Sequence, residues 1–252
     1  MAAKASPFSI FRFEELDSTN TYVQEHLHQL DNLSVVSAFR QTAGRGQRGN
    51  RWLSAPGENL TFTLLLKFGE GALGVRHQMR LTALATVSIL EVLREAAPAY
   101  AASFRIKWPN DLYTGDRKIC GMLIENTLEG PWIRSSAIGI GLNVNQKDFA
   151  PELVNPCSLR RLTGRTFDTE ELLERFLTRI GAWLPRLDSP DLWEHYRREL
   201  YRLGERHAWT ETATGAQLSG CIRDVREDGR LELVLDDGSV RLFAFKEISY
   251  II

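Results

Sequence analysis

The chain has 252 residues, which is enough for one large domain or for a medium domain with a smaller one. Apolar residues make up 43% and charged residues 25%, and the formal net charge is -1, so the composition excludes a bulk electrostatic attraction to nucleic acid. The first residues lack a long apolar run, and no stretch approaches the roughly 20 apolar residues that span a bilayer, so neither a signal peptide nor a membrane helix is expected.

Short apolar runs alternate with amphipathic segments along the first part of the chain. A helix is expected from Asp17 or Ser18 to about residue 30, and a longer helix, dense in apolar residues, from 75 to 97. Apolar runs of β-type composition predict strands at residues 8–13, 33–39, 60–68, 104–108, 118–125 and 135–144. These elements place the motifs described below at strand ends and in the loops that follow strands.

Two helices and a change of pattern follow. Asp168 begins a capping box for a helix to about residue 187, and the pair SP at residues 189–190 begins a helix to about residue 203. Residues 205–252 carry short alternating runs separated by Asp-Gly turns, which predict a small β-barrel or meander of four or five strands. The expected domains are residues 1–203 and residues 204–252.

The stretch GRGQRG, residues 44–49, has the G-x-G-x-x-G spacing of a dinucleotide-binding loop. Such a loop must end a strand and open a helix, because the pyrophosphate lies on the helix N-terminus. A strand is expected before it, but NRWLSAPGENL follows it, so the required helix is not expected. Arg45, Arg48 and Arg51 alternate with glycines, which favours an ordered anion clamp over a mobile basic loop or an RGG-type RNA-binding segment.

A second match to the same spacing is GEGALG, residues 69–74, between an expected strand and an expected helix. Glu70 would place a carboxylate beside the phosphates of a nucleotide, and no ribose-binding acid follows at a strand end. We therefore interpret this stretch as a glycine-rich connector.

Two neighbouring motifs, KWPND at residues 107–111 and KICGMLIE at residues 118–125, are joined by a Gly-Asp turn. Lys107 and Asn110 would face a polyanion at the strand end, or the first motif would form a simple Asn-Asp turn. Lys118 begins an otherwise apolar strand, where a lysine is rarely buried without a reason, or it lies in solvent at a strand edge.

The motif GIGLNVN, residues 139–145, places two glycines and two asparagines on an expected central strand. Glycine weakens a strand unless something packs against its backbone. Gly139 and Gly141 therefore favour a strand surface against which a ligand packs over a β-bulge. Gly121 would let a ligand approach the backbone of the preceding strand in the same way. Asn143 would need a hydrogen-bond partner if it is buried.

Together these motifs supply lysine, arginine, asparagine and glycine, without an evident Ser-His-Asp set, paired carboxylates or metal cage. Cys120, Cys157 and Cys221 are widely spaced, and the five histidines form no metal constellation, so a reducing cytoplasm is the expected location. Such a set suits charge stabilisation and positioning of a phosphate-bearing substrate. The residues thus indicate an anion-handling enzyme that uses a nucleotide.

The motifs, in this order, resemble those of the biotin protein ligases (biotin–[acetyl-CoA carboxylase] ligases). The matching segments are STN at 18–20, QTAGRGQRG at 41–49 with Trp52, KWPND, KICGMLIE and GIGLNVN. The resemblance covers residues 8 to about 203, and the last 48 residues fit the small SH3-like domain of that family. It implies an α/β (α+β) fold, with a mixed-sheet catalytic domain of the class II synthetase and biotinyl/lipoyl ligase type followed by a small SH3-like β-barrel.

The resemblance also implies a reaction in two steps. Biotin and Mg-ATP give biotinyl-5′-AMP and pyrophosphate, and a lysine of a biotin carboxyl carrier protein then attacks the adenylate and releases AMP. ATP, Mg²⁺ and biotin are the implied cofactors and substrate, with Mg²⁺ held through the ATP phosphates. DNA is not an expected partner, because only about 17 residues precede Ser18, too few for the helix-turn-helix domain of some relatives. A membrane is not an expected partner either, because no apolar run is long enough to span one. A monomer and a homodimer both remain open.

The roles of individual residues follow from the same resemblance. Lys118 and Arg45 would bridge the biotin carboxylate and the α-phosphate, and Asp111 would orient or deprotonate the incoming lysine. Trp52 and Trp108 are either core anchors or ligand walls. The residues implied for biotin are Ser18, Thr19, Asn20, Gln41, Gly44, Arg45, Gly46, Gln47, Lys118, Gly121, Gly139 and Gly141. The residues implied for ATP are Arg45, Arg48, Trp52, Lys107, Asn110, Lys118 and Asn143.

Gln47 departs from the resemblance, since many members of the family carry a second arginine at this position. Glutamine keeps hydrogen-bonding capacity but loses the charge, so Arg48 or Arg51 would share in holding the phosphate of the adenylate. The alternative enzyme is a lipoate or octanoate transferase of the same fold. Such an enzyme would require a long apolar tunnel for the acyl chain, and the polar residues at 18–20 and Gln41 argue against one. A non-catalytic biotin or nucleotide binder is a further alternative, and the presence of both Arg45 and Lys118 argues against it.

Overall fold

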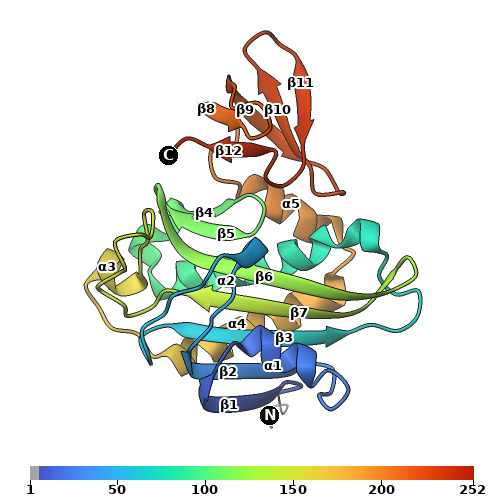
Figure 1. The fold of residues 1–252 in the computed structure, drawn as a ribbon, viewed down its shortest axis with the longest axis vertical. Helices are drawn as coiled ribbons and strands as arrows, with labels where there is room; N and C mark the ends of the chain where they lie inside the picture. The colour runs from blue at the N-terminus through green and yellow to red at the C-terminus, as the bar shows by residue number, and fades with distance from the viewer. Residues whose placement is uncertain (1–5) are drawn as a thin grey trace.

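The computed structural model describes residues 6–252, and its larger sheet gathers the strands of the first part of the chain (Figure 1). The seven strands lie in the order β1-β2-β3-β7-β6-β5-β4. They are β1 (Ser9–Leu16), β2 (Ser34–Gln41), β3 (Leu60–Lys67), β4 (Phe104–Lys107), β5 (Asp111–Thr114), β6 (Arg117–Glu129) and β7 (Trp132–Leu142). The pair β1–β2 is parallel and the other neighbouring pairs are antiparallel, so the expected mixed sheet is confirmed.

The central strand, β7, has a different character on each face. It lies between β3 and β6, and successive side chains of a strand point to opposite faces. Ile138, Ile140 and Leu142 are buried in the main core, whereas Gly139 and Gly141 alternate with them and lie on the opposite face. Because glycine has no side chain, other groups can approach the backbone of β7 closely on that face.

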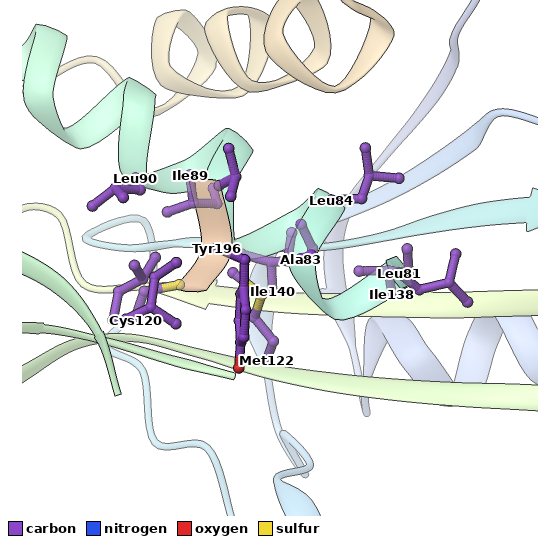
Figure 2. Close-up of a cluster of buried hydrophobic side chains, with 14 of the residues drawn as sticks. Leu81, Ala83, Leu84, Ile89, Leu90, Cys120, Met122, Ile138, Ile140 and Tyr196 are labelled. Carbon is purple, nitrogen blue, oxygen red and sulfur yellow. The ribbon is translucent and has the colours of Figure 1, made fainter. Parts of the chain in front are cut away.

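Three helices, α2 (Met79–Ala96), α4 (Thr169–Trp183) and α5 (Pro190–Arg198), cover one face of this sheet (Figure 1). Figure 2 shows the core that they form with the sheet, where Leu81 and Leu84 of α2 lie near Ile138 and Ile140 of β7. The helix α2 is buried on most of its surface, because α4 and α5 pack against it as well. The dense apolar composition of this segment therefore reflects burial on several sides.

The short helix α1 (Thr19–Glu25) lies on the opposite face, against β2, β3 and β7 (Figure 1). Its Val23 packs with Val36, Leu65 and Ala137 in a second, smaller core. The helix is too short to cover this face completely, so part of the sheet beside it remains available to line a cavity.

The C-terminal part of the chain forms a separate antiparallel sheet in the order β11-β10-β9-β8-β12. Its strands are β8 (Arg206–Glu211), β9 (Gln217–Val225), β10 (Leu231–Leu235), β11 (Val240–Phe243) and β12 (Ile248–Tyr250). The sheet lies beyond the β4–β5 edge of the larger sheet (Figure 1). Its buried Trp209 and Phe243 belong to the same apolar cluster as the core beneath α2, so the two sheets are joined by packed side chains.

Some elements end earlier than the sequence predicts because their backbone groups pair elsewhere. The helix α5 stops at Arg198 rather than near residue 203, since the amide of Ile106 donates to Glu199 O and the amide of Tyr201 donates to Ile106 O. Two other bounds differ as well: α1 stops at Glu25 rather than near residue 30, and the long helix expected over 75–97 begins as a short 3-10 turn. The short elements that the sequence does not predict are β5, α3 (Leu159–Thr163), η1 (Gln47–Gly49), η2 (Val75–His77), η3 (Pro98–Ser103) and η4 (Leu184–Arg186).

Two further features of residues 6–252 bear on the chain's environment. None of their helices is both long and apolar enough to cross a membrane. Cys120, Cys157 and Cys221 are free thiols, and the first two are buried. Burial raises the pKa of the Cys120 thiol well above its ordinary value, so this side chain stays protonated and packs as an apolar group.

Glu199 ties the end of α5 to α2 and β4. Its carboxylate accepts hydrogen bonds from Arg94 Nη1 at 3.0 Å and from Arg105 Nη1 at 2.9 Å. Burial acts to raise the pKa of Glu199, but the hydrogen bond and charge of Arg94, together with the charge of Arg105, lower it below its ordinary value. A lowered pKa stabilises the fold above the pKa of the unfolded chain, and this stabilisation is lost as the pH falls through the folded-state pKa.

The substitution Glu199→Gln is therefore expected to reduce the free energy of unfolding at pH 7 by about 1–3 kcal/mol. The difference from the parent protein should shrink as the pH falls below 4.5, the ordinary pKa of glutamate. Urea unfolding measured from pH 7 down to about pH 3.5 tests this, with Glu194→Gln, an exposed position on the same helix, as the control. A difference that stays constant over this range would contradict the assignment.

Candidate active site

A cavity of about 430 Å³ lies beside α1, on the face of the larger sheet that carries the glycines of β7. Its walls come from the start of α1, the loop after β2, the β4–β5 turn, strands β6 and β7, and the C-terminal sheet. The site residues expected from sequence that line it are Ser18, Thr19, Asn20, Gln41, Arg45, Gly46, Gln47, Trp52, Lys107, Asn110, Asp111, Lys118, Gly121, Gly139 and Gly141. The tertiary structure thus brings residues of every motif to one place.

Three expected site residues are placed differently. Gly44 lies beside the cavity wall, where its carbonyl accepts a hydrogen bond from the amide of Trp52 at 2.9 Å. Asn143 lines a neighbouring cavity instead. The side chain of Arg48 is outside the part of the chain that the structure describes.

The loop after β2 closes on itself rather than opening a helix. The amide of Gly46 donates to Asn50 O at 2.7 Å, and Arg45 and Arg51 form an isolated antiparallel bridge. Only the three-residue 3-10 turn η1 follows, so the strand-to-helix context of a dinucleotide loop is missing, as the sequence predicts. The second glycine-rich stretch, residues 69–74, does not contribute to the lining of this cavity.

Neutral polar side chains form a hydrogen-bonded set at one part of the cavity. Asn20 donates from Nδ2 to Leu123 O at 3.2 Å, and its Oδ1 lies 2.6 Å from Thr63 Oγ1. Thr63 Oγ1 lies 2.8 Å from Thr19 Oγ1, and the amide of Thr19 donates to Gln41 Oε1 at 2.8 Å. Buried polar groups that are bonded in this way hold fixed positions. They therefore offer a defined pattern of donors and acceptors to a neutral polar ligand.

Glycines are required on β6 and β7 by the side chains that lie over them. A Cβ at Gly139 would stand 1.9 Å from Asn20 Oδ1, and a Cβ at Gly141 would stand 2.3 Å from Trp52 Cε2. Gly121 pairs with Gly141 across the sheet, and a Cβ there would stand 3.1 Å from Trp52. Trp52 is therefore a wall of the cavity, and its buried Nε1 has no hydrogen-bond partner among the described residues.

Lys118, near the start of β6, reaches the cavity beside Asp111. Its Nζ lies 2.8 Å from Asp111 Oδ1, and the two side chains are 31% and 24% exposed. The backbone of Lys118 is fixed on both sides, since its amide donates to Asn155 O and its carbonyl accepts from the amide of Cys157. Electrostatic interactions are stronger for half-buried groups than for groups in open water. Lys118 is thus a positioned cation whose charge Asp111 balances.

Glu125 holds Arg45 at the cavity, and it is not among the site residues expected from the sequence. Arg45 Nη2 lies 2.7 Å from Glu125 Oε1, and Arg45 Nη1 lies 3.1 Å from Oε2, so the ion pair is bidentate. Asn20 Nδ2 also donates to Glu125 Oε2 at 3.0 Å. Glu125 is four residues after Gly121 on β6, so strand alternation puts both on one face, and this was the signal available. Its carboxylate joins the arginine loop to the polar set at α1.

The KWPND turn is anchored in the C-terminal sheet. Trp108 is 4% exposed, and its Nε1 donates to Gly229 O at 2.9 Å, so this tryptophan is a core anchor. Lys107 Nζ lies 4.6 Å from the ring centre of Tyr250, and burial lowers the pKa of its ammonium group below the ordinary value. Asn110 Nδ2 donates to a backbone carbonyl of β6 at 2.6 Å.

A second cavity, of about 600 Å³, adjoins Lys118 and Trp52. Its lining is largely apolar, and Phe149 and Leu153 contribute to it. Asn143 lies at its edge and donates from Nδ2 to a backbone carbonyl at 3.0 Å. The residues that line it after β7 belong to an irregular segment, which the sequence did not identify because it has no periodic pattern.

The substitution Glu125→Gln is expected to loosen the loop after β2. It replaces a bidentate ion pair by neutral hydrogen bonds, and because the Arg45 side chain is 44% exposed the loss is about 0.5–1 kcal/mol. Trypsin should therefore cleave within residues 44–49 about two- to fivefold faster. Glu129→Gln breaks a comparable surface ion pair, with Arg134, at the far end of β6 and should leave this rate unchanged. Equal cleavage of the Glu125→Gln variant and the parent would contradict the role of Glu125.

The sequence was compared with models of known protein families. Residues 12–145, more than half of the chain, match the model described as the biotin/lipoate A/B protein ligase family. The chain belongs to this ligase family. The matched residues contain all the motifs on which the resemblance was based, from STN to GIGLNVN.

Individual members of the ligase family agree with this assignment. The biotin–[acetyl-CoA-carboxylase] ligase of Paracoccus denitrificans is 34% identical over 177 residues, which cover 69% of this chain and 72% of that protein. The bifunctional ligase/repressor BirA of Salmonella typhimurium is 30% identical over 178 residues, and the match spans about half of that protein, 54%. The expected resemblance to biotin protein ligases is confirmed.

A solved structure of the ligase family has the same fold. It is the biotin protein ligase from Aquifex aeolicus in complex with biotin and ATP, with a TM-score of 0.76 at 27% sequence identity. The alignment covers 96% of this chain and 97% of that chain, so it includes the C-terminal sheet as well as the larger one.

Proposed function

We propose that this protein activates biotin with ATP and transfers it to a lysine of a biotin carboxyl carrier protein. In the first step, a carboxylate oxygen of biotin attacks the α-phosphorus of ATP, and pyrophosphate leaves. In the second step, the ε-amino group of the carrier lysine attacks the acyl carbon of biotinyl-5′-AMP. An amide bond forms, AMP leaves and the amine gives up a proton. The family membership and the names of the relatives support both substrates.

The observation that carries the proposal is the presence of two chemically different regions in one cavity. Asn20, Thr19 and Gln41 supply neutral donors and acceptors, whereas Arg45 and Lys118 supply cations. Biotin has the matching polarity, with a neutral ureido ring at one end and a carboxylate at the other. An octanoyl chain, or the hydrocarbon part of a lipoyl chain, has no donors or acceptors that match this neutral polar region.

Lys118 and Arg45 would supply the electrostatic stabilisation of the first step. The biotin carboxylate and the α-phosphate repel each other, and two fixed cations between them offset this repulsion in the transition state. Each cation is held in place by a carboxylate, Asp111 for Lys118 and Glu125 for Arg45, so little rearrangement is needed. When the substrates draw Lys118 toward the phosphate, Asp111 becomes available to orient the carrier lysine or accept its proton.

The nucleotide would extend into the second cavity beside Lys118. Its apolar lining suits a planar base, and Phe149 supplies an aromatic surface. Asn110 and Asn143 each donate from the amide nitrogen to a backbone carbonyl, so their Oδ1 atoms are the groups available to a cation. Mg²⁺ would shield the ATP phosphates, and neutral amide oxygens are ligands that it accepts.

We infer that the larger and smaller sheets act as a catalytic domain, residues 1–203, and an SH3-like domain, residues 204–252. The second unit would also help to receive the carrier protein, because Ser249 and Tyr250 form part of the cavity wall. A cytoplasmic location is consistent with a substrate such as ATP and with free cysteine thiols.

The first experiment is ATP–pyrophosphate exchange measured with biotin, with lipoate and with no acid. Exchange that depends on biotin is the expected result, followed by transfer to a carrier protein when one is added. Exchange with lipoate alone would replace the proposal by a lipoate ligase. Absence of exchange with either acid, on folded protein, would overturn adenylation and leave a binding role.

The substitution Gln47→Arg tests the departure from the family pattern. A second arginine in the loop would add a charge-assisted hydrogen bond to the phosphate of the adenylate. Dissociation of biotinyl-5′-AMP should therefore slow by about tenfold, while the affinity for biotin alone changes less than twofold. Equal changes in both quantities, measured by stopped-flow release and equilibrium titration, would exclude a phosphate-specific role.

A further inference from the structure

A tyrosine of the helical layer is hydrogen-bonded to the KWPND turn. Tyr196 lies on α5 and is fully buried. Its ring packs in the main core, and Figure 2 shows it together with Ala83 of α2, Met122 of β6 and Ile140 of β7. Its hydroxyl group donates a hydrogen bond to Pro109 O at 2.7 Å. The helix-covered face of the sheet is thus connected to a turn that lines the cavity on the other face.

The hydroxyl group of Tyr196 is a polar group on a side chain that otherwise packs as an apolar one. Burial raises the pKa of this hydroxyl well above its ordinary value, so it stays protonated and acts as a donor at neutral pH. Phenylalanine would fill nearly the same volume without a polar atom, so the packing of the ring does not by itself require tyrosine. The hydroxyl group therefore serves its acceptor, the carbonyl of Pro109.

That carbonyl belongs to the peptide unit between Pro109 and Asn110. A peptide unit is planar, so a hydrogen bond to its oxygen restricts the orientation of the plane and the position of the next Cα. Asn110 is 5% exposed, and its Nδ2 donates to Met122 O at 2.6 Å, so the turn is held from α5 and from β6. The next residue is Asp111, whose carboxylate lies 2.8 Å from Lys118 Nζ in the cavity.

The segment after Tyr196 fixes the strand that leads into the turn. The amide of Ile106, in β4, donates to Glu199 O at 2.8 Å. The amide of Tyr201 donates in turn to the carbonyl of Ile106, also at 2.8 Å. A short stretch, residues 196–201, therefore holds both β4 and the turn in place. The cavity side chains of the turn depend on how this stretch packs.

We propose that Tyr196 is a positioning residue, which acts through the carbonyl of Pro109 on the side chains of Asn110 and Asp111. This inference rests on the proposed function, in which Asn110 serves the ATP phosphates and Asp111 serves the carrier lysine. Reaction rates depend steeply on the positions of such groups. The neutral polar set at α1 is held instead by contacts with β2, β3 and β6, so the affinity for biotin should not depend on Tyr196.

The substitution Tyr196→Phe removes the hydroxyl group and keeps the ring, so the variant is expected to fold. The kcat of biotin-dependent ATP–pyrophosphate exchange should fall by about tenfold, and so should the rate of transfer from preformed biotinyl-5′-AMP to a carrier protein. The KM for biotin should change by less than twofold. Amide hydrogen exchange, followed by mass spectrometry, should become about three- to tenfold faster at residues 107–112 and stay unchanged in β7.

Leu192→Val is the matched control on the same helix. Leu192 is 1% exposed and packs in the same core, and its side chain has no polar atom. Both substitutions should lower the urea midpoint by a similar amount, but Leu192→Val should keep the parent kcat and the parent hydrogen exchange at residues 107–112. An equal fall in kcat for the two variants would assign Tyr196 to stability alone and overturn the inference.

Unchanged kcat and unchanged hydrogen exchange at residues 107–112 in Tyr196→Phe would overturn the inference as well. A rise in the KM for biotin as large as the fall in kcat would do the same, because it would indicate a general loosening of the cavity. The hydrogen exchange of the turn tests the contact without turnover. A parent protein that shows no biotin-dependent ATP–pyrophosphate exchange would instead reject the proposed function.

Discussion

Replacing Lys118 with alanine is expected to slow biotin-dependent ATP–pyrophosphate exchange by about 10²–10³-fold. The variant loses a cation that would offset repulsion between the carboxylate and the α-phosphate. It also leaves the Asp111 carboxylate, now 2.8 Å from Lys118 Nζ, without its partner and adds an unbalanced negative charge to the cavity. The rate should fall more than the affinity for biotin does, because the cation acts mainly on the transition state.

The double variant Lys118→Ala with Asp111→Asn separates these two effects. Removing the unpaired carboxylate should restore part of the ATP affinity lost in the single variant, while the exchange rate stays low. Lys67→Ala, at the end of β3, is the control for removal of a lysine from the same sheet and should keep the parent rate. A Lys118→Ala protein that folds and retains more than about a tenth of the parent rate would exclude the proposed role.

Replacing Gly139 with alanine is expected to raise the KM for biotin by about 10²-fold. A Cβ at this position would lie 1.9 Å from Asn20 Oδ1, so the Asn20 side chain must move. That movement would break its hydrogen bonds with Thr63 and Glu125 and disturb the polar set that is proposed to recognise the ureido ring. The displacement should also lower the free energy of unfolding by about 1–3 kcal/mol.

The natural control for Gly139→Ala is Gly69→Ala in the connector after β3. A Cβ at Gly69 would meet nothing within 4 Å, and its φ is not in the left-handed region. This substitution should change neither stability nor the KM for biotin or ATP. Biotin titration and exchange kinetics on the three proteins give the comparison. A raised KM for ATP in Gly69→Ala would indicate that the stretch GEGALG binds nucleotide. Normal biotin binding by Gly139→Ala would show that biotin does not lie against β7 at this position.

A chain of contacts couples the two parts of the cavity. It runs from Arg45 through Glu125 and Asn20 to Thr63. It connects the cationic part of the cavity with the neutral polar part. A ligand that binds Asn20 therefore acts on the partner of Arg45 as well. We expect the arginine loop to close when biotin and ATP bind, because its glycines permit a change of conformation. Protection of this loop from protease by the two substrates would test the closure, and the proteolysis of the Glu125→Gln variant provides its baseline.

Local patterns in the sequence were sufficient to predict most strands of the larger sheet and the residue types of the site. Strand alternation separates Ile138 and Ile140 from Gly139 and Gly141 whatever the neighbours of β7 are. The same local rules exclude a dinucleotide loop at residues 44–49, because proline and glycine follow where a helix would have to begin. Charge and glycine are properties of the residues themselves, so Arg45, Lys118 and the glycine-bearing strands could be identified without knowing the fold.

The contacts between distant parts of the chain could not be predicted in this way. Asn20 and Glu125 are 105 residues apart, and their contact depends on where α1 packs relative to β6. The assignment of Trp108 to the core depends on the position of the C-terminal sheet, and that of Trp52 to the cavity wall depends on its packing over Gly121 and Gly141. Local sequence sets the chemistry and face of each side chain, whereas partners across the chain are set by the packing of distant elements.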